Sequence, residues 1–265
     1  MHSFTVDAAT LWLPLLKRLT ERLPSWGLWK NADTALSGQG DFDSTAPVED
    51  WSTITAEFRR WAFENGLGPV AICREVSGVL FLLAVDRERH VALELDVNAR
   101  KYFRAWTMFT PADLRPVMEI DPRGFRRVRP GAEGIILLVQ NGLRWGGRPD
   151  VEGLRRKEVR RFLASDPEGV RLASHLFGSA DEALRAAAAA VIGGGWDRRA
   201  MLTLESWALA RALTRPGVIA GRLAAPRRKR RCPLLHTIFI DDRRIDDVDA
   251  WVRAVERDHD VFHSP

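Results

Sequence analysis

The sequence is poor in cysteine and contains no long apolar segment. Its two cysteines, Cys73 and Cys232, stand far apart in the 265-residue chain, which excludes a disulfide framework and a zinc-ligand pattern. No run of about 18 apolar residues occurs, so the sequence predicts no membrane-spanning helix. The start of the chain, with Asp7 and an interrupted apolar run, does not fit a signal peptide. These absences favour a protein of the reducing cytoplasm that has no membrane partner.

Charged residues are abundant, and basic ones are in excess. The composition, 46% apolar and 28% charged, is that of a globular protein. A net charge of +5 permits a polyphosphate or nucleic-acid partner without identifying one. The basic run 227–231 fits a solvated linker, an RNA contact or a membrane-surface patch. Because charge runs are usually solvated, we favour the linker, with RNA binding as the sharper alternative.

The hydrophobic pattern predicts an α+β protein, with a small mixed or antiparallel sheet, flanking helices and a helical C-terminal domain. In the first half of the chain we expect two helices, at 7–22 and 50–64, with Asp7 and Asp50 as their N-caps. The expected strands are 26–31, 41–47, 70–73, 79–85 and 90–97. Residues 32–40 are polar and Gly-rich, which indicates a loop. Segment 79–85 is apolar throughout, as in a strand that is buried on both faces.

A change of pattern near residue 130 suggests three parts. We expect an α/β domain over 1–128, a helical domain over 129–225, and a basic linker with a terminal strand and helix over 226–265. The helices of the second part are expected at 132–145, 150–165, 167–177, 180–192 and 198–213. In the last part, 236–240 reads as a strand and 245–258 as a helix.

The most informative stretch is Ser37-Gly38-Gln39-Gly40-Asp41-Phe42-Asp43. If Asp41 and Asp43 lie on a strand, the period of two sends both carboxylates to the same face. Two carboxylates aimed at one point repel each other, and a divalent cation such as Mg²⁺ relieves that repulsion. An ordinary polar turn is the competing interpretation, since Gly and Asp dominate turns.

A second acidic strand follows about fifty residues later. Segment 90–97 alternates, with Val91, Leu93, Leu95 and Val97 on one face and Ala92, Glu94 and Asp96 on the other. Asp96 is the better partner for Asp41 and Asp43, and Glu94 is the alternative. A solvent-facing strand position is the simpler interpretation of Asp96.

These features resemble the nucleotidyltransferase superfamily, which has the DNA polymerase β-like palm fold, and suggest a divergent bacterial-type member. The resemblance covers about residues 7–105. It rests on a helix, a short strand, a Gly-rich turn into Asp41-Phe42-Asp43, and a later strand, expected to be antiparallel, that carries a third carboxylate. The superfamily's Gly-Ser motif lies further before the acidic pair. Lys30-Asn31 stands there in this chain, whereas Ser37-Gly38 is closer to Asp41.

The resemblance implies transfer of an NMP from an NTP to an acceptor hydroxyl with release of pyrophosphate. It assigns two Mg²⁺ ions to Asp41, Asp43 and Asp96, with Glu94 as the alternative ligand. Binding of the triphosphate falls to Lys30, Asn31, Ser37 and Gly38. The acceptor implied is a small molecule or tRNA.

Two other interpretations stay open. A protein that keeps the palm fold but has lost catalysis would bind a nucleotide or RNA, and the departure from the Gly-Ser motif favours it. A helical interaction protein with an accidental acidic turn is the other possibility. It requires that Asp41, Asp43 and Asp96 do not converge.

Overall fold

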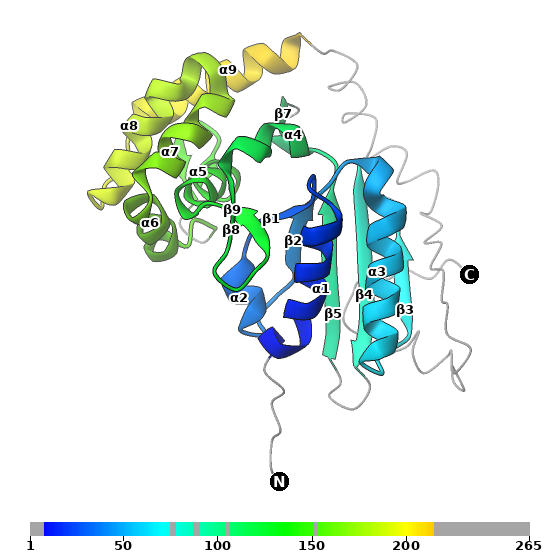
Figure 1. Ribbon diagram of the computed structural model, residues 1–265. Helices are drawn as coiled ribbons and strands as arrows, with labels where there is room; N and C mark the ends of the chain where they lie inside the picture. Colours follow the sequence, from blue (N-terminus) through cyan, green and yellow to red (C-terminus); the bar gives the residue numbers. More distant parts are fainter. Residues whose placement is uncertain (1–7, 75–77, 87–90, 104–105, 151–152, 215–265) are drawn as a thin grey trace, which may run out of the picture.

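The computed structural model describes residues 8–74, 78–86, 91–103, 106–150 and 153–214. The strands of its main sheet are β1 (Gly27–Lys30), β2 (Phe42–Thr45), β3 (Val70–Cys73), β4 (Val79–Asp86), β5 (Val91–Asn98), β8 (Met118–Ile120) and β9 (Arg126–Val128). They form a mixed sheet in the order β3-β4-β5-β2-β1-β9-β8 (Figure 1). Two small hairpins, β6 (Lys101–Phe103) with β7 (Trp106–Phe109) and β10 (Leu143–Arg144) with β11 (Arg148–Pro149), stand apart from it. The predicted α+β class is confirmed.

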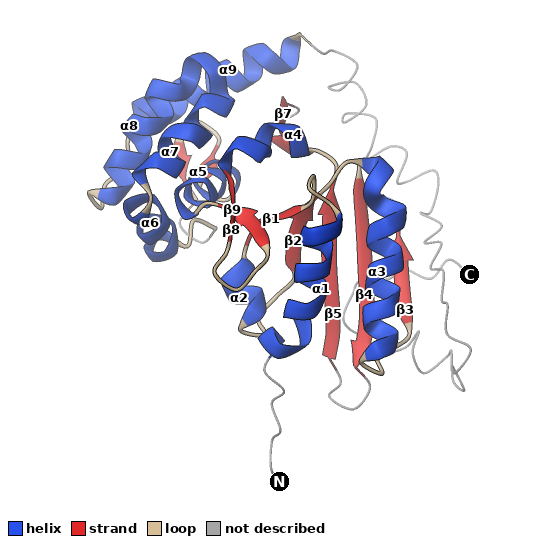
Figure 2. Ribbon diagram, in the orientation of Figure 1, coloured by secondary structure: helices blue, strands red, loops and turns tan. Residues whose placement is uncertain are grey.

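Helices surround the sheet. They are α1 (Ala8–Arg22), α2 (Ala32–Leu36), α3 (Trp51–Glu64), α4 (Pro111–Leu114), α5 (Pro130–Gln140), α6 (Arg156–Ser165), α7 (Pro167–Ser174), α8 (Asp181–Ile192) and α9 (Arg198–Leu213), with 3-10 turns η1 (Val48–Asp50), η2 (Arg115–Val117) and η3 (His175–Ala180). Helices α1 and α3 cover one face of the sheet and run roughly along its strands, whereas α5–α9 gather beside the sheet (Figure 2). In the part of the chain described, no helix combines the length and apolar character needed to cross a membrane.

One face of the sheet packs on α1 and α3. Leu82 of β4 and Leu95 of β5 share a buried cluster with Leu15 of α1 and Phe58 of α3. Along β4, buried residues alternate with half-buried ones. The expectation that 79–85 is buried on both faces is therefore wrong, because α1 and α3 cover only the face toward which every second side chain points.

A second buried cluster joins the sheet to the later helices. Trp29 of β1 and Val128 of β9 pack with Ile135 of α5, Leu184 of α8 and Leu204 of α9. The core is thus continuous across the expected boundary at 128/129. Burial of these side chains fixes α5 against β1, the strand that pairs with β2.

Several local predictions need correction. Residues 32–40 are not all loop, because α2 forms there and buries Ala32, Ala35 and Leu36. Asp50 does not cap α3 with its side chain, and instead accepts a hydrogen bond from the Ser25 hydroxyl.

The ends of two later helices also differ from the prediction. The helix expected over 132–145 ends at Gln140, because Leu143 and Arg144 pair with β11 as strand β10. Gly146 and Gly147 take positive φ in the turn between the two strands. The helix expected from 150 begins at Arg156. The proposed cap Asp7 and the expected segment 226–265 lie outside the described residues.

Candidate active site

The site is built on three neighbouring strands of the sheet. Strand β1 pairs antiparallel with β2, and β2 pairs parallel with β5. Their registers place Lys30 opposite Asp43 and Asp43 opposite Asp96. Paired residues point to the same side of a sheet, so these three side chains form a row. Phe42 and Leu95 point the other way, into the cluster under α1 and α3.

The three predicted carboxylates converge. Asp41 directly precedes β2, Asp43 lies within it, and Asp96 lies on β5. One oxygen of each lies within 4.8 Å of an oxygen of the other two. Asp43 is almost fully buried, at 3% exposed, whereas Asp41 and Asp96 are partly accessible. The interpretation of 37–43 as only a polar turn, and of Asp96 as an isolated surface residue, does not account for this arrangement.

The ionised forms of these carboxylates are disfavoured by burial and by their mutual repulsion. Burial is the main cause that raises the pKa of Asp96, to about 9, and Glu94, Asp43 and Asp41 add to it. Burial also raises the pKa of Asp43, against the opposing effect of Lys30. Glu94 is outside the converging set but forms a hydrogen bond with Asp96. A divalent cation would offset the repulsion among these groups.

The donor set suits such a cation. Oδ1 of Asp96 is buried and, among the described atoms, has no hydrogen-bond partner, and a buried acceptor without a partner is costly. Three carboxylates within coordinating reach supply the oxygen ligands that Mg²⁺ prefers. The residues present therefore fit the metal that the resemblance implies.

Two lysines border the carboxylates. Nζ of Lys30 lies 2.9 Å from Oδ2 of Asp43. The ammonium groups of Lys30 and Lys101 lie 4.9 and 5.0 Å from the centroid of the Trp29 ring. Burial lowers the pKa of Lys101, and the nearby Lys30 lowers it further, whereas Asp43 and Asp96 oppose the shift. The site thus pairs an acidic centre with a basic border suited to phosphate oxygens.

Asn31 connects the acidic centre to the helices beyond it. It is the N-cap of α2 and has a left-handed backbone, with φ 60° and ψ 13°. Its Nδ2 donates to Oδ2 of Asp43 at 3.2 Å, and its Oδ1 accepts from Arg155 at 3.3 Å. The structure therefore places both Lys30 and Asn31 against Asp43.

Ser37 and Gly38 occupy a different place. Ser37 is the exposed C-cap of α2, and its hydroxyl donates to the carbonyl of Thr34 at 2.7 Å. Gly38 has φ 82° and lies beside Ala8 of α1. Within the described part of the chain, no contact joins either residue to the three carboxylates. Their assignment to the nucleotide stays a prediction from the resemblance.

The residues that bind the backbone of Asn31 were not identified from the sequence. The backbone N–H of Asn31 donates to Oε1 of Glu133 at 2.7 Å, and Oε2 of Glu133 accepts from Arg127 at 2.8 Å. A signal was present in the sequence, because Glu133 is the one charged residue in the mainly apolar helix 130–140. A buried carboxylate needs a partner, although the sequence does not identify it.

Comparison of the chain with protein-family models, with curated proteins and with solved structures finds no match.

Proposed function

We propose that this protein is a Mg²⁺-dependent nucleotidyltransferase that moves an NMP from an NTP to an acceptor hydroxyl. The observation that carries the proposal is the convergence of Asp41, Asp43 and Asp96 within 4.8 Å of one another. Asp43 and Asp96 stand opposite each other on β2 and β5, and Asp41 directly precedes β2. The resemblance to the palm fold implies an acidic pair and a third carboxylate on an antiparallel strand; here β5 is antiparallel to β4 but parallel to β2. In the reaction, the acceptor oxygen forms a bond to the α-phosphorus and the bond from that phosphorus to the bridging oxygen breaks. Pyrophosphate leaves, and the acceptor loses its proton.

The carboxylates would hold the metal. In this proposal Asp41 and Asp43 would hold two Mg²⁺ ions, and Asp96 would help to hold one of them on the acceptor side. The bound ions would supply charge neutralisation at the attacking and leaving oxygens. In this proposal Asp96 would also accept the acceptor's proton, as an ionised carboxylate. Bound Mg²⁺ favours the ionised form, and would so oppose the burial that raises the pKa of Asp96 in the metal-free protein.

The basic border would hold the triphosphate. Lys30 pairs with Asp43 in the free protein at 2.9 Å, and its flexible stem allows it to turn to a phosphate oxygen. Lys101 stands beside the same indole ring. Phosphoryl transfer depends chiefly on positioning and charge neutralisation, which these groups provide.

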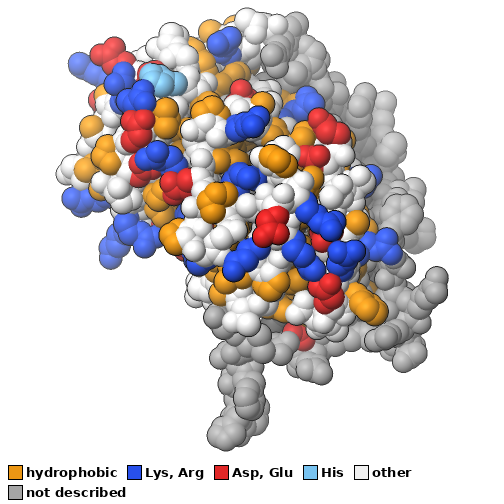
Figure 3. Space-filling model, in the orientation of Figure 1, with side chains coloured by type: hydrophobic (Ala, Val, Ile, Leu, Met, Phe, Trp, Pro, Cys, Tyr) orange, Lys and Arg blue, Asp and Glu red, His pale blue; other side chains and the backbone are white. Residues whose placement is uncertain are grey.

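The acceptor is a small molecule or tRNA in this proposal. On the face shown in Figure 3, acidic side chains lie among the basic ones, so this view gives no preference for RNA. The basic run 227–231 lies outside the described residues. The choice between acceptors therefore falls to experiment.

One observation favours a second candidate, a nucleotide- or RNA-binding protein that keeps the palm fold without catalysis. Oδ2 of Asp43 already accepts from both Lys30 and Asn31. The ammonium group of Lys30 thus supplies part of the positive charge that a catalytic metal ion would bring to Asp43. Saturable binding of Mg²⁺ and NTP without turnover would be its signature.

The test is transfer of label from each of the four α-labelled NTPs, with Mg²⁺, into total tRNA and into a small-molecule extract. The wild type is compared with Asp43→Asn and with the control Glu49→Gln, which changes an exposed carboxylate on η1. A metal site contributes several kcal/mol to the transition state, so Asp43→Asn should lose about 10³-fold in rate. Label in either pool that depends on Asp43 supports the enzyme. No label, together with saturable NTP binding, supports the binding protein.

A further inference from the structure

Asn31 has a backbone conformation that needs support. It is one of two non-glycine residues with positive φ in the described chain, and the other is Arg155 at φ 38°. The two side chains meet at 3.3 Å. Left-handed conformations are unfavourable for residues with a Cβ, and they persist where surrounding contacts over-determine them. The contacts of Asn31 therefore have to hold this conformation in place.

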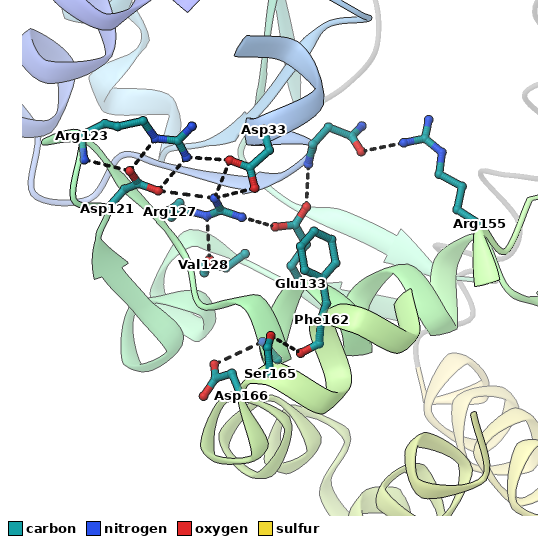
Figure 4. Close-up of polar contacts among 12 residues, drawn as sticks. Asp33, Asp121, Arg123, Arg127, Val128, Glu133, Arg155, Phe162, Ser165 and Asp166 are labelled. Atoms are coloured by element: carbon teal, nitrogen blue, oxygen red, sulfur yellow. Dashed lines mark hydrogen bonds and ion pairs between the residues drawn. The ribbon is translucent and has the colours of Figure 1, made fainter. Parts of the chain in front are cut away.

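The strongest of these contacts is with a buried ion pair. The Asn31 N–H donates to Oε1 of Glu133 at 2.7 Å, and Oε2 of the same carboxylate accepts from Nη2 of Arg127 at 2.8 Å. Glu133 is 1% exposed and Arg127 is 5% exposed. Figure 4 shows Arg127 between the carboxylate of Glu133 and those of Asp33 and Asp121.

Arg127 also holds the first turn of α2. Its Nη1 lies 3.3 Å from both carboxylate oxygens of Asp33, which is the second residue of that helix. Arg123 binds the same carboxylate at 2.6 Å. The corner between β1 and α2 is thus fixed from two sides, by Glu133 at the Asn31 N–H and by Arg127 at Asp33.

A buried ion pair contributes little net stability compared with apolar groups of the same shape. Such a pair can instead fix the positions of the groups that it binds. Here the imposed geometry is that of Asn31, whose Nδ2 reaches Oδ2 of Asp43. A continuous path of hydrogen bonds therefore runs from Arg127 through Glu133 and Asn31 to Asp43.

We propose that Glu133 and Arg127 are positioning residues of the metal centre. Neither touches the three carboxylates directly; they act through Asn31, which they hold in the left-handed conformation that aims its amide at Asp43. This inference rests on the proposed function, since it assigns a role to residues around the proposed metal ligands. Partners of metal ligands typically influence metal affinity or activity by about 10–100-fold.

The substitution Glu133→Gln tests the proposal. Glu133 uses a different oxygen for each partner, whereas glutamine has one oxygen and one N–H₂ group. The amide nitrogen must then face a donor, either the Asn31 N–H or Arg127. We expect the affinity for Mn²⁺ alone, measured by electron paramagnetic resonance without nucleotide, to fall about tenfold or more.

Glu57→Gln is the matched control. Glu57 is likewise buried, at 3% exposed, and is paired with an arginine, Arg22, at 2.6 Å. It lies on α3, however, which packs on the opposite face of the sheet. Both variants alter a buried carboxylate, and thermal unfolding of each measures the loss of stability. We expect Glu57→Gln to keep the wild-type Mn²⁺ affinity.

The outcomes separate this inference from the proposed function. If Glu133→Gln binds Mn²⁺ as the wild type does, the positioning role is wrong and the metal site stands. If Glu57→Gln weakens binding equally, the effect is general destabilisation and the positioning role is again wrong. A wild type that binds no Mn²⁺, or binds it as well after Asp43→Asn, would contradict the proposed function and this inference together.

Discussion

Nζ of Lys30 lies 2.9 Å from Oδ2 of Asp43, the most buried of the three carboxylates. The pair sits in register on adjacent antiparallel strands. An ammonium group in that position partly neutralises Asp43 in the free protein, and its positive charge opposes the approach of a cation. In the proposed function, Lys30 would therefore link metal binding to nucleotide binding, because its ammonium group could pair either with Asp43 or with a phosphate oxygen.

We expect Lys30→Met to change metal and nucleotide affinities in opposite directions. Without the competing ammonium group, Mn²⁺ alone should bind about tenfold more tightly, which corresponds to about 1.4 kcal/mol. The KM for NTP should rise, because a phosphate partner is lost. Mn²⁺ titration and steady-state transfer measure the two effects. Lys17→Met, at an exposed position on α1, is the control, and an unchanged Mn²⁺ affinity in Lys30→Met would contradict the competition.

The raised pKa of Asp96 predicts a pH-dependent stability of the metal-free protein. Its pKa is about 9 in the folded state against an ordinary value of 3.8. Between these values the folded state binds more protons than the unfolded state, so the free energy of unfolding falls as pH rises. The stabilising contribution of Asp96 to the free energy of unfolding is fully present below about pH 4 and is lost as the pH rises through about 9. Asp96→Asn should flatten this slope.

Denaturant unfolding from pH 5 to 9, in the presence of a chelator, measures the effect. Glu94 takes part in the shift, so the relevant quantity is the difference in slope between wild type and Asp96→Asn. Mg²⁺ binds the ionised carboxylate, and its stabilising effect should therefore grow with pH in the wild type alone. Equal slopes in the two proteins would show that Asp96 ionises normally.

Close packing of α5 on α7 predicts a sensitive glycine. A Cβ at Gly131 would lie 2.0 Å from the carbonyl oxygen of Asp166 and 2.6 Å from the amide nitrogen of Val170. Both are backbone atoms and cannot rotate away. Gly131→Ala should destabilise the protein by about 1–3 kcal/mol, measured by denaturant unfolding. Gly195→Ala, where the nearest atom is 3.5 Å away, should have little effect, and equal losses would contradict this packing.

The alternating strand that carries Asp96 was predictable because each of its side chains has one of two environments. Val97 and Leu95 go into the core, which sends Asp96 and Glu94 to the other face. The choice between these two acids was not decided by alternation, since they share a face. It is decided by the parallel register that places Asp96, rather than Glu94, beside Asp43, and register depends on contacts between distant segments.

The support behind the site was less predictable for the same reason. Asn31 and Glu133 are 102 residues apart in sequence, and nothing local in either segment indicates the other. The short helix α2 was also missed. The polar and glycine residues 37–40 that follow it are typical of loops, and the stability of so short a helix comes from burying three apolar side chains.

Substitutions at Asn31 separate the effect of its side-chain hydrogen bonds on Mn²⁺ affinity from the effect of its left-handed backbone on stability. Asn31→Gly removes the hydrogen bonds to Asp43 and from Arg155 but tolerates φ 60°. Asn31→Ala removes the same bonds and adds a left-handed cost of about 1–2 kcal/mol. We therefore expect both variants to bind Mn²⁺ less tightly than the wild type, and the alanine variant to be the less stable by about 1 kcal/mol or more. Mn²⁺ titration and denaturant unfolding give the two readouts.

Asn65 provides the matched pair of controls. It caps the C-terminal end of α3 with φ −102°, where a Cβ carries no left-handed penalty, so Asn65→Ala should be at least as stable as Asn65→Gly. Neither should change Mn²⁺ binding, because Asn65 donates to the Trp61 carbonyl on the helix-covered side of the sheet. If Asn31→Ala matched Asn31→Gly in stability, the left-handed backbone would not be held by Glu133. The path from Arg127 to Asp43 would then lack its central link.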